Sequence, residues 1–350
     1  MRLKAIIVTV HNSENCGSFL QAFAMQRTLQ LLGYDVSFLY RNPSNTSHAI
    51  KKCFRSVGYL LHQQRYTDAW YVLKQWIIYE YLQKKYFRQV PPDSSFAKKA
   101  DLVVLGSDTI WNFEDKYFYS TADRLLGLTL KGKHIISYAA SLGNTSEDVF
   151  KNVVDEHGGL DHISKLLVRD SHTQKVLKSS FGRDSEIVCD PTLLVTSDCF
   201  NELTKAVNLG NNYILLYYFG EVPLHIKEEV LRYARAHNLK VASLIYKRDW
   251  CDIFIPSSPI NMVSYYKEAS SVVTNTFHGC ALSLIFQKPF AVYEEGKIKV
   301  TELLGTYYLS DRLFSDSSVI PMLLERKIDK MEIIRTTAEK SMKRLKDVIK

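Results

Sequence analysis

The segment from Val272 to Leu284 constrains the fold of this chain more than any other part of the sequence. It begins with a short β-branched run, continues through a polar turn, and then takes up an apolar helical pattern that starts at His278 and Gly279. A buried strand that passes through a tight loop into a helix is the building unit of parallel α/β sheets. The sequence therefore predicts an α/β protein.

The same order of elements recurs along the chain. Residues 4–10 predict a buried strand, residues 19–32 show helical spacing that ends at Gly33, and residues 36–40 predict the next strand. A strand, a helix and a strand with short links form a parallel βαβ unit. Further apolar runs that end in small or polar residues occupy residues 102–105, 135–140, 165–168, 213–219 and 241–245. Because ligands lie outside the carboxyl ends of parallel strands, we expect the functional residues directly after such runs.

The length of 350 residues predicts two domains. A polar segment follows Asp190-Pro191-Thr192, so we place an N-terminal domain over residues 1–195 and a second α/β domain over residues 196–320. Residues 321–350 carry a charged amphipathic pattern and predict a C-terminal helix. A basic, aromatic helical segment, residues 50–90, is inserted in the first domain.

Composition narrows the class of protein. Hydrophobic residues make up 46% of the chain and charged residues 23%, as in a globular protein. The six cysteines show neither a C-x-x-C pair nor metal-ligand spacing, and the apolar run at residues 5–10 is shorter than the core of a signal peptide. No apolar run approaches the roughly twenty residues that cross a bilayer. These features favour a cytoplasmic protein with free thiols and no bound metal.

The inserted segment is unusually basic and aromatic. Between Ile50 and Arg88, eight basic residues stand against Asp68 and Glu80, which gives a net charge of +6, and ten side chains are aromatic. This mixture suits the surface of an anionic membrane, at the inner face, or a nucleic acid. It equally suits a helical insertion that packs its aromatics into the fold. No nucleic-acid-binding motif accompanies the charge, so we expect no nucleic-acid partner and leave the other two interpretations open.

The start of the helix at His278 is the strongest candidate site. A helix N-terminus offers backbone N–H groups and a partial positive charge, so anions bind there readily. An imidazole beside such an anion can donate a hydrogen bond or act as a general acid near neutral pH. Thr276 and Gly279 flank it and are counted as substrate-binding residues. The alternative is a capped core helix whose histidine only satisfies backbone groups.

Two further clusters follow predicted strands. Asn15, Gly17 and Ser18 precede the first helix, where glycine allows close approach and serine caps the helix. Asp108 follows the strand at residues 102–105 and could accept a proton from a sugar hydroxyl, with Trp111 as an aromatic wall of the pocket. The alternative for Asp108 is to cap the next turn.

Arginine and lysine could supply the positive charge that an anionic substrate requires. Arg169 ends the strand at residues 165–168 and could grip a carboxylate or phosphate with two parallel hydrogen bonds. It could instead form an ion pair with Asp170 or another acid. Lys297 and Lys299 could add charge near His278 if their loop folds back, and we count Lys299 as a substrate-binding residue. The sequence contains no Walker loop, no G-x-G-x-x-G and no H-E-x-x-H motif.

In this order, the clusters resemble the polysaccharide pyruvyl transferase family. The matching pieces are Asn15-Cys16-Gly17-Ser18-x-Leu20-Gln21-Ala22, Gly106-Ser107-Asp108-x-x-Trp111, Tyr138-Ala139-Ala140-Ser141-Leu142-Gly143, Val168-Arg169-Asp170, Asp190-Pro191-Thr192-Leu193-Leu194, Thr274-x-Thr276-Phe277-His278-Gly279, and Leu303-Leu304 with Asp311-Arg312. Each piece is short, but the seven pieces together cover nearly the whole chain.

The resemblance implies both a fold and an activity. The fold would be two Rossmann-like domains that face each other across a cleft, as in two-domain glycosyltransferases, with the acceptor on the N-terminal side and the donor on the C-terminal side. The activity would be transfer of a pyruvate ketal from phosphoenolpyruvate to a sugar of a cell-surface polysaccharide or its precursor, such as an exopolysaccharide or capsule. By resemblance, His278 and Arg169 would lie at the phosphoenolpyruvate and Asp108 near the acceptor.

The chemistry requires an acid, a base and cations, and no cofactor beyond phosphoenolpyruvate as the donor substrate. His278 is the candidate acid, Asp108 the candidate base, and Arg169 with the helix start the anion-binding group. The acceptor could be a lipid-linked oligosaccharide. Two alternatives remain open: a nucleotide-sugar-dependent glycosyltransferase of the same fold, and a non-catalytic glycan-binding module.

Overall fold

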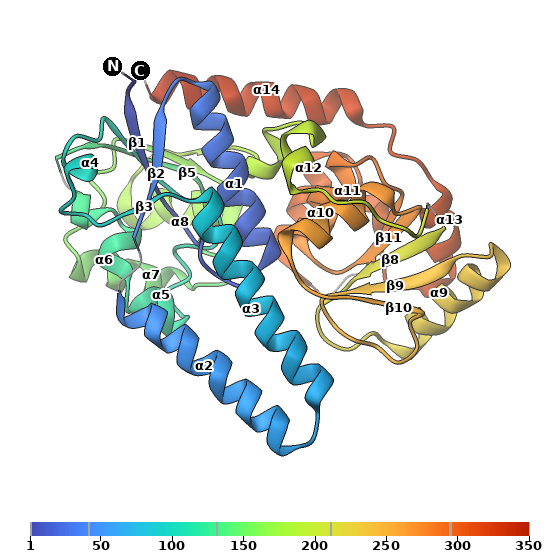
Figure 1. Cartoon of the computed structure of the whole chain (residues 1–350). Helices are drawn as coiled ribbons and strands as arrows, with labels where there is room; N and C mark the ends of the chain where they lie inside the picture. The colour runs from blue at the N-terminus through green and yellow to red at the C-terminus, as the bar shows by residue number, and fades with distance from the viewer. Residues whose placement is uncertain (1, 41–42, 131, 211, 294–295, 350) are drawn as a thin grey trace. The chain divides into compact units, whose positions relative to one another are not determined.

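The computed structural model describes residues 2–40, 43–130, 132–210, 212–293 and 296–349 (Figure 1). The chain divides into two compact units. The first contains Met1–Leu194 and Glu339–Lys350, and the second contains Val195–Ala338. The sequence places the boundary one residue later, after residue 195.

The first unit is built on a parallel sheet of seven strands in the order β3-β2-β1-β4-β5-β6-β7. The strands are β1 (Lys4–Val8), β2 (Asp35–Leu39), β3 (Gln89–Val90), β4 (Leu102–Leu105), β5 (His134–Ala140), β6 (Lys165–Val168) and β7 (Glu186–Ile187). The central strands are almost entirely buried, because the connections of a parallel sheet cover both of its faces. This is why these strands appear in the sequence as continuous apolar runs.

Helices connect the strands of the first unit. They are α1 (Cys16–Leu31), α2 (Pro43–His62), α3 (Tyr66–Tyr86), α4 (Ser95–Lys98), α5 (Lys116–Tyr119), α6 (Ala122–Leu125), α7 (Glu147–Glu156) and α8 (Ser171–Phe181), with 3-10 turns at Leu128–Leu130 and Pro191–Leu193. Helix α1 ends where the sequence predicts, since Gly33 adopts a φ of +92° just beyond it. Helices α2 and α3 pack against each other as a hairpin inserted between β2 and β3, and Figure 1 shows their tip extending beyond the sheet.

The second unit contains a parallel sheet of six strands in the order β10-β9-β8-β11-β12-β13. The strands are β8 (Tyr213–Tyr217), β9 (Lys240–Leu244), β10 (Ile253–Ile255), β11 (Ser271–Thr274), β12 (Phe290–Tyr293) and β13 (Leu313–Phe314). The helices are α9 (Leu224–Ala236), α10 (Pro259–Glu268), α11 (Phe277–Ile285), α12 (Ile298–Thr306) and α13 (Ile320–Glu325), with 3-10 turns at Ser197–Leu203, Ser310–Arg312 and Ser317–Val319. The strand, turn and helix predicted from Val272 onward are β11 and α11.

The C-terminal region differs from the single helix predicted over residues 321–350. It contains the end of α13, a loop, and α14 (Met331–Val348), whose last part belongs to the first unit. The buried side chain of Arg312 explains the interruption. Its guanidinium donates to the carbonyl oxygens of Leu323, Arg326 and Lys327 at 2.8–2.9 Å, so these carbonyl groups leave the helical pattern. Arg312, which belongs to the family-like pieces, is thus a structural residue.

Candidate functional site

Each sheet has a point where the strand order reverses. In the first sheet the chain runs outward from β1 to β3 on one side and from β4 to β7 on the other, so the reversal lies between β1 and β4. In the second sheet it lies between β8 and β11. Ligands of open α/β sheets bind outside the carboxyl ends of the strands at such points. In each sheet, the loops that follow these central strands, β1 and β4 or β8 and β11, are therefore the expected ligand-binding loops.

The loop after β1 leads into the start of α1. The side-chain oxygen of Asn15 accepts the backbone N–H groups of Gly17 at 2.8 Å and of Ser18 at 3.4 Å. The Ser18 hydroxyl donates to Oδ2 of Asp108 at 2.7 Å. The structure thus brings together two clusters that the sequence separates by 90 residues. Asn15 is a helix cap here, and Ser18 links the helix to the candidate base.

The loop after β4 holds Asp108 in an unusual backbone conformation. A Cβ atom on Gly106 would lie 2.4 Å from the carbonyl oxygen of Tyr138, and φ of Gly106 is +109°, so only glycine fits. Ser107 is fully buried and donates to Oε1 of Gln21 on α1 at 2.5 Å. Asp108 itself has a φ of +74°, and its side chain is 15% exposed. These contacts fix a carboxylate that solvent still reaches.

Arg169 reaches this cluster from the end of β6. Its Nη1 atom lies 3.7 Å from Oδ1 of Asp108 and 3.4 Å from Oδ2 of Asp190, and its side chain is only 4% exposed. Oδ1 of Asp190 also accepts the backbone N–H and the hydroxyl of Thr192. Asp170, the acid that the sequence suggests as a partner, instead caps α8 by accepting the N–H of Thr173. Arg169 is therefore held between two carboxylates, and its contact with a donor anion stays a prediction.

Arg169→Lys should lower the free energy of unfolding by about 1–3 kcal/mol without any ligand. A lysine has one ammonium group and cannot reach both carboxylates as the guanidinium does, which leaves a buried charge poorly compensated. Denaturant unfolding measures the loss. Arg232→Lys is the control, because Arg232 is an exposed partner of Glu229 and its replacement should change stability by less than about 0.5 kcal/mol. Equal stability of the two variants would contradict the buried role of Arg169.

Trp111 does not line a pocket, contrary to the sequence-based interpretation. Its side chain is fully buried in the hydrophobic core, its ring lies 5.7 Å from that of Phe150, and its indole N–H donates to the carbonyl oxygen of Leu125 at 3.2 Å. A buried indole that has satisfied its single donor is a core residue. Trp111 follows Asp108 by three residues because its side chain packs into the core beneath this loop.

In the second unit, Thr276 and His278 lie where β11 passes into α11. Thr276 is the N-cap, and its hydroxyl accepts the N–H of Gly279 at 2.9 Å. His278 is the second residue of the helix and is half-buried, with its ring edge-on to that of Phe277. The imidazole therefore stands at the positive end of a helix, at the carboxyl edge of a central strand. This is the local arrangement that the sequence predicts.

Gly279 is required by close packing at the start of α11. A Cβ atom there would lie 2.1 Å from Oγ1 of Thr274 and 2.6 Å from Oγ1 of Thr276. The two threonine hydroxyls are themselves 3.1 Å apart. The absence of a side chain on Gly279 thus lets the helix start directly on the end of β11, which fixes the position of His278.

Gly279→Ala should destabilise the protein by about 1–3 kcal/mol, because the added methyl group overlaps the Thr274 side chain and the cap must shift. Gly305→Ala is a matched control: Gly305 also lies in a helix, α12, and its nearest neighbour to an added Cβ is Oγ of Ser310 at 4.0 Å. Alanine at that position should stabilise the protein by about 0.5–1 kcal/mol. Thermal unfolding of both variants measures the difference. Similar midpoints would show that the α11 start is not tightly packed.

Asn275 and Lys297 complete the surroundings of this helix start. The Asn275 side chain exchanges two hydrogen bonds of 2.9 Å with the backbone of Phe219, so it joins the loops after β8 and β11. The ammonium group of Lys297 donates to the carbonyl oxygen of Asn275 at 3.1 Å. Lys297, just before α12, thus lies at this helix start, whereas Lys299 is exposed in the first turn of α12. No pattern in the sequence indicates this role of Asn275.

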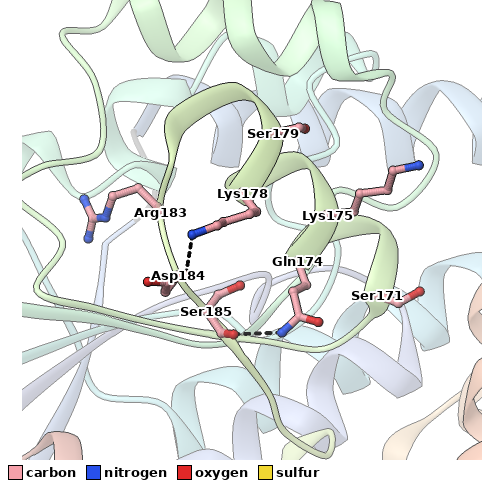
Figure 2. Close-up of a pocket in the computed structure, with 8 residues that line it drawn as sticks. All are labelled: Ser171, Gln174, Lys175, Lys178, Ser179, Arg183, Asp184 and Ser185. Atoms are coloured by element: carbon pink, nitrogen blue, oxygen red, sulfur yellow. Dashed lines mark hydrogen bonds and ion pairs between the residues drawn. The ribbon is translucent and has the colours of Figure 1, made fainter.

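A surface cavity of about 450 Å³ lies along α8 (Figure 2). It is lined by Ser171, Gln174, Lys175, Lys178, Ser179, Arg183, Asp184 and Ser185. Figure 2 shows Lys178 paired with Asp184, at 2.8 Å, and the amide of Gln174 donating to the backbone of Ser185. Its polar lining is largely occupied by internal contacts and includes none of the residues predicted from the sequence. We therefore place the candidate site at the strand ends.

Within the described ranges, no group of three or more His, Cys, Asp and Glu side chains is placed to hold a metal ion. All six cysteines are free thiols, and burial raises the pKa of the Cys189 thiol to about 12. Among the helices of the described residues, none is both long and apolar enough to span a bilayer.

A family model for polysaccharide pyruvyl transferases matches residues 15–296. The chain belongs to this family. The match begins at the Asn15 cap, runs through Asp108 and Arg169, and extends past the start of α11 at His278. As a member of this family, the protein is a transferase of polysaccharide biosynthesis.

Solved structures share its two-domain fold. A putative UDP-N-acetylglucosamine 2-epimerase from Listeria monocytogenes has a TM-score of 0.50 and 10% identity, with 98% of this chain and 91% of that chain covered. The S. aureus MnaA structure with UDP has a TM-score of 0.50 and 10% identity, with 99% of this chain and 96% of that chain covered. Arabidopsis thaliana UGT89C1 with quercetin has a TM-score of 0.48 and 11% identity, with 100% of this chain and 99% of that chain covered. No curated protein sequence matches significantly. The two structures with a TM-score of 0.50 and the two parallel sheets of the chain agree with the predicted two-domain α/β fold.

Proposed function

We propose that the protein transfers the pyruvyl group of phosphoenolpyruvate to two hydroxyl groups of one sugar residue, which forms a pyruvate ketal and releases inorganic phosphate. The acceptor is a sugar of a cell-surface polysaccharide, such as an exopolysaccharide or capsule, or of a lipid-linked precursor. The observation that carries the proposal is the family match, which includes both clusters that end central strands.

The reaction balances with one acid and one base. Protonation of the methylene carbon of the enol phosphate produces a cationic carbon, and the first sugar hydroxyl attacks it and loses its proton. The second hydroxyl then displaces the phosphate from the same carbon, and its proton leaves with the products. The methyl group of the ketal keeps the proton that the acid supplied. No redox step and no metal are required, so we expect phosphoenolpyruvate to be the only activated reactant.

The residues are assigned by chemistry. His278 is the general acid, because its half-buried imidazole lies in the first turn of α11. Asp108 is the general base, because its carboxylate is held by Ser18 yet remains reachable by solvent. The start of α11 with Thr276 and Gly279 supplies dipole stabilisation for the donor phosphate. Lys297 donates a hydrogen bond to the backbone of this loop, and Lys299, which is exposed, supplies further positive charge.

Titration with two donors tests the proposal. Calorimetry should show binding of phosphoenolpyruvate and no comparable binding of UDP-N-acetylglucosamine. Turnover with a polysaccharide repeat-unit acceptor should release phosphate in step with a new ketal methyl signal in the proton NMR spectrum. Binding of the nucleotide sugar alone would favour a glycosyltransferase, and binding of neither donor would favour a glycan-binding module. Either result would overturn the proposal.

A further inference from the structure

The α2–α3 hairpin carries many large hydrophobic side chains that are exposed to solvent and do not pack into the fold. Seven of them are between 45% and 65% exposed: Phe54, Tyr59, Leu61, Tyr66, Trp70, Ile77 and Tyr81. The sequence leaves open whether the aromatics of this segment are simply core. Tyr79 is core, with its hydroxyl 2.8 Å from Sγ of Cys16, and Trp76 is half-buried against Phe54. Trp70 is not.

The exposed side chains of α3 form a stripe. Tyr66, Trp70, Ile77 and Tyr81 are separated by four, seven and four positions, so they lie on one face of the helix within an arc of about 60° and along about 22 Å of its axis. We call these four residues the aromatic stripe. The buried residues Ala69, Tyr79, Leu82 and Gln83 lie on the other side of α3. The fold uses that buried side, and the stripe contributes little to it.

Both helices of the hairpin carry exposed cationic side chains. Lys74, Lys84 and Lys85 on α3 and Lys51 and Arg55 on α2 are all exposed. The acids of the segment are already engaged with its own cations: Asp68 lies 2.8 Å from Arg65, and Glu80 lies 3.8 Å from Lys84. The exposed face of the hairpin therefore combines an apolar, Tyr- and Trp-rich line with an excess of positive charge.

We propose that the α2–α3 hairpin docks the protein peripherally on an anionic lipid surface. The stripe rests at the level of the headgroups, where Tyr and Trp are favoured, and the basic residues contact anionic headgroups. A groove in a partner protein could cover the apolar line but would leave the flanking cations uncompensated, whereas a lipid surface offers negative charge along the whole helix. Because the opposite face of α3 is buried in the first unit, the attachment is superficial.

Vesicle co-sedimentation of the full chain tests the proposal without requiring catalysis, so its outcome is independent of the proposed donor. Vesicles of equal parts phosphatidylglycerol and phosphatidylcholine should bind the protein at low salt, and high salt should release most of it. Vesicles of phosphatidylcholine alone should bind it much more weakly. Absence of binding, or binding that ignores both lipid charge and salt, would overturn the proposal.

Two sets of variants locate the contact. The triple substitution Tyr66→Ser, Trp70→Ser and Tyr81→Ser should lower the vesicle partition coefficient at least about tenfold. Its control is Leu31→Ser with Tyr119→Ser, which removes exposed hydrophobics elsewhere on the first unit. The double substitution Lys74→Gln and Lys84→Gln should lower the vesicle partition coefficient about thirtyfold. Each basic residue near an anionic lipid surface contributes about a factor of five to this coefficient. Its control is Lys98→Gln with Lys99→Gln, two exposed lysines of the same unit.

All of these side chains are exposed, so thermal unfolding should be unchanged in every variant. If the stripe variant binds vesicles as the unsubstituted protein does, the stripe is not the contact and the proposal fails. If sedimentation without lipid shows a dimer that the stripe variant converts to a monomer, while vesicle binding stays the same, the occupant is a second copy of the chain.

Discussion

Replacing His278 with alanine is expected to lower the rate of pyruvyl transfer by about two to four orders of magnitude and to leave the fold intact. The imidazole stands in the first turn of α11, at the carboxyl edge of β11, where it can protonate a donor bound at the helix start. Alanine keeps the helix but removes the proton donor. Phosphate release with saturating donor and acceptor measures the rate, and thermal unfolding verifies the fold.

His225 offers a matched control for this substitution. It is also the second residue of a helix, α9, in the same unit, and it is exposed. His225→Ala should therefore retain full activity. If His278→Ala keeps more than about a tenth of the original rate with normal stability, His278 is not the general acid, and the alternative of a histidine that only supports the helix start would stand.

The strands of both sheets could be predicted because parallel strands are buried on both faces. The run Leu102–Leu105 is β4 to the residue. The runs for β1 and β8 are each two residues too long, because Val10 and Phe219 extend the apolar pattern beyond the last paired residues. The short strands β3, β7 and β13 carry only two residues each and leave no periodic signal. The break between α13 and α14 depends on Arg312, a contact that no local pattern reveals.

The sequence could predict which polar residues follow the ends of the strands, but it could not predict which of these side chains contact one another. Residues that end central strands meet at one edge of a sheet, which is why Ser18 and Asp108 lie together. The partners of a charged residue depend on distant loops, and the sequence could not show that Arg169 contacts Asp190. Trp111 was wrongly interpreted because an aromatic residue after a strand end can face either a ligand or the core, and side-chain direction is fixed only by packing.

For the α2–α3 hairpin too, the sequence could not tell which aromatic side chains are buried and which are exposed. Tyr79 and Trp70 lie on one helix with similar neighbours in sequence, yet Tyr79 is buried against α1 and Trp70 is exposed. Helical spacing separates the two faces of α3, but only the contact with the first unit tells which of them is the inner face. A composition of aromatic and basic residues could therefore support both interpretations, and burial divides the segment between them.

Asp108→Asn tests the base with almost no change in shape. The carboxylate oxygen Oδ1 accepts the N–H of Thr109 at 2.8 Å, and an asparagine carbonyl can accept the same bond. Asparagine also tolerates the positive φ of this position better than most residues. Asp115→Asn is the matched control, because Asp115 likewise accepts a backbone N–H, from Tyr117, in an exposed turn of the same unit.

We expect Asp108→Asn to lower turnover by about two to four orders of magnitude, because an amide cannot remove a proton from the attacking sugar hydroxyl. Ser18→Ala should have a much smaller effect on turnover, since it removes only the hydrogen bond that orients the carboxylate. Donor affinity measured by calorimetry should change less than turnover in Asp108→Asn if the residue acts on the acceptor. A parallel loss of donor binding and turnover would instead place Asp108 at the donor, and unchanged turnover would show that its carboxylate serves only to hold Ser18 and Arg169.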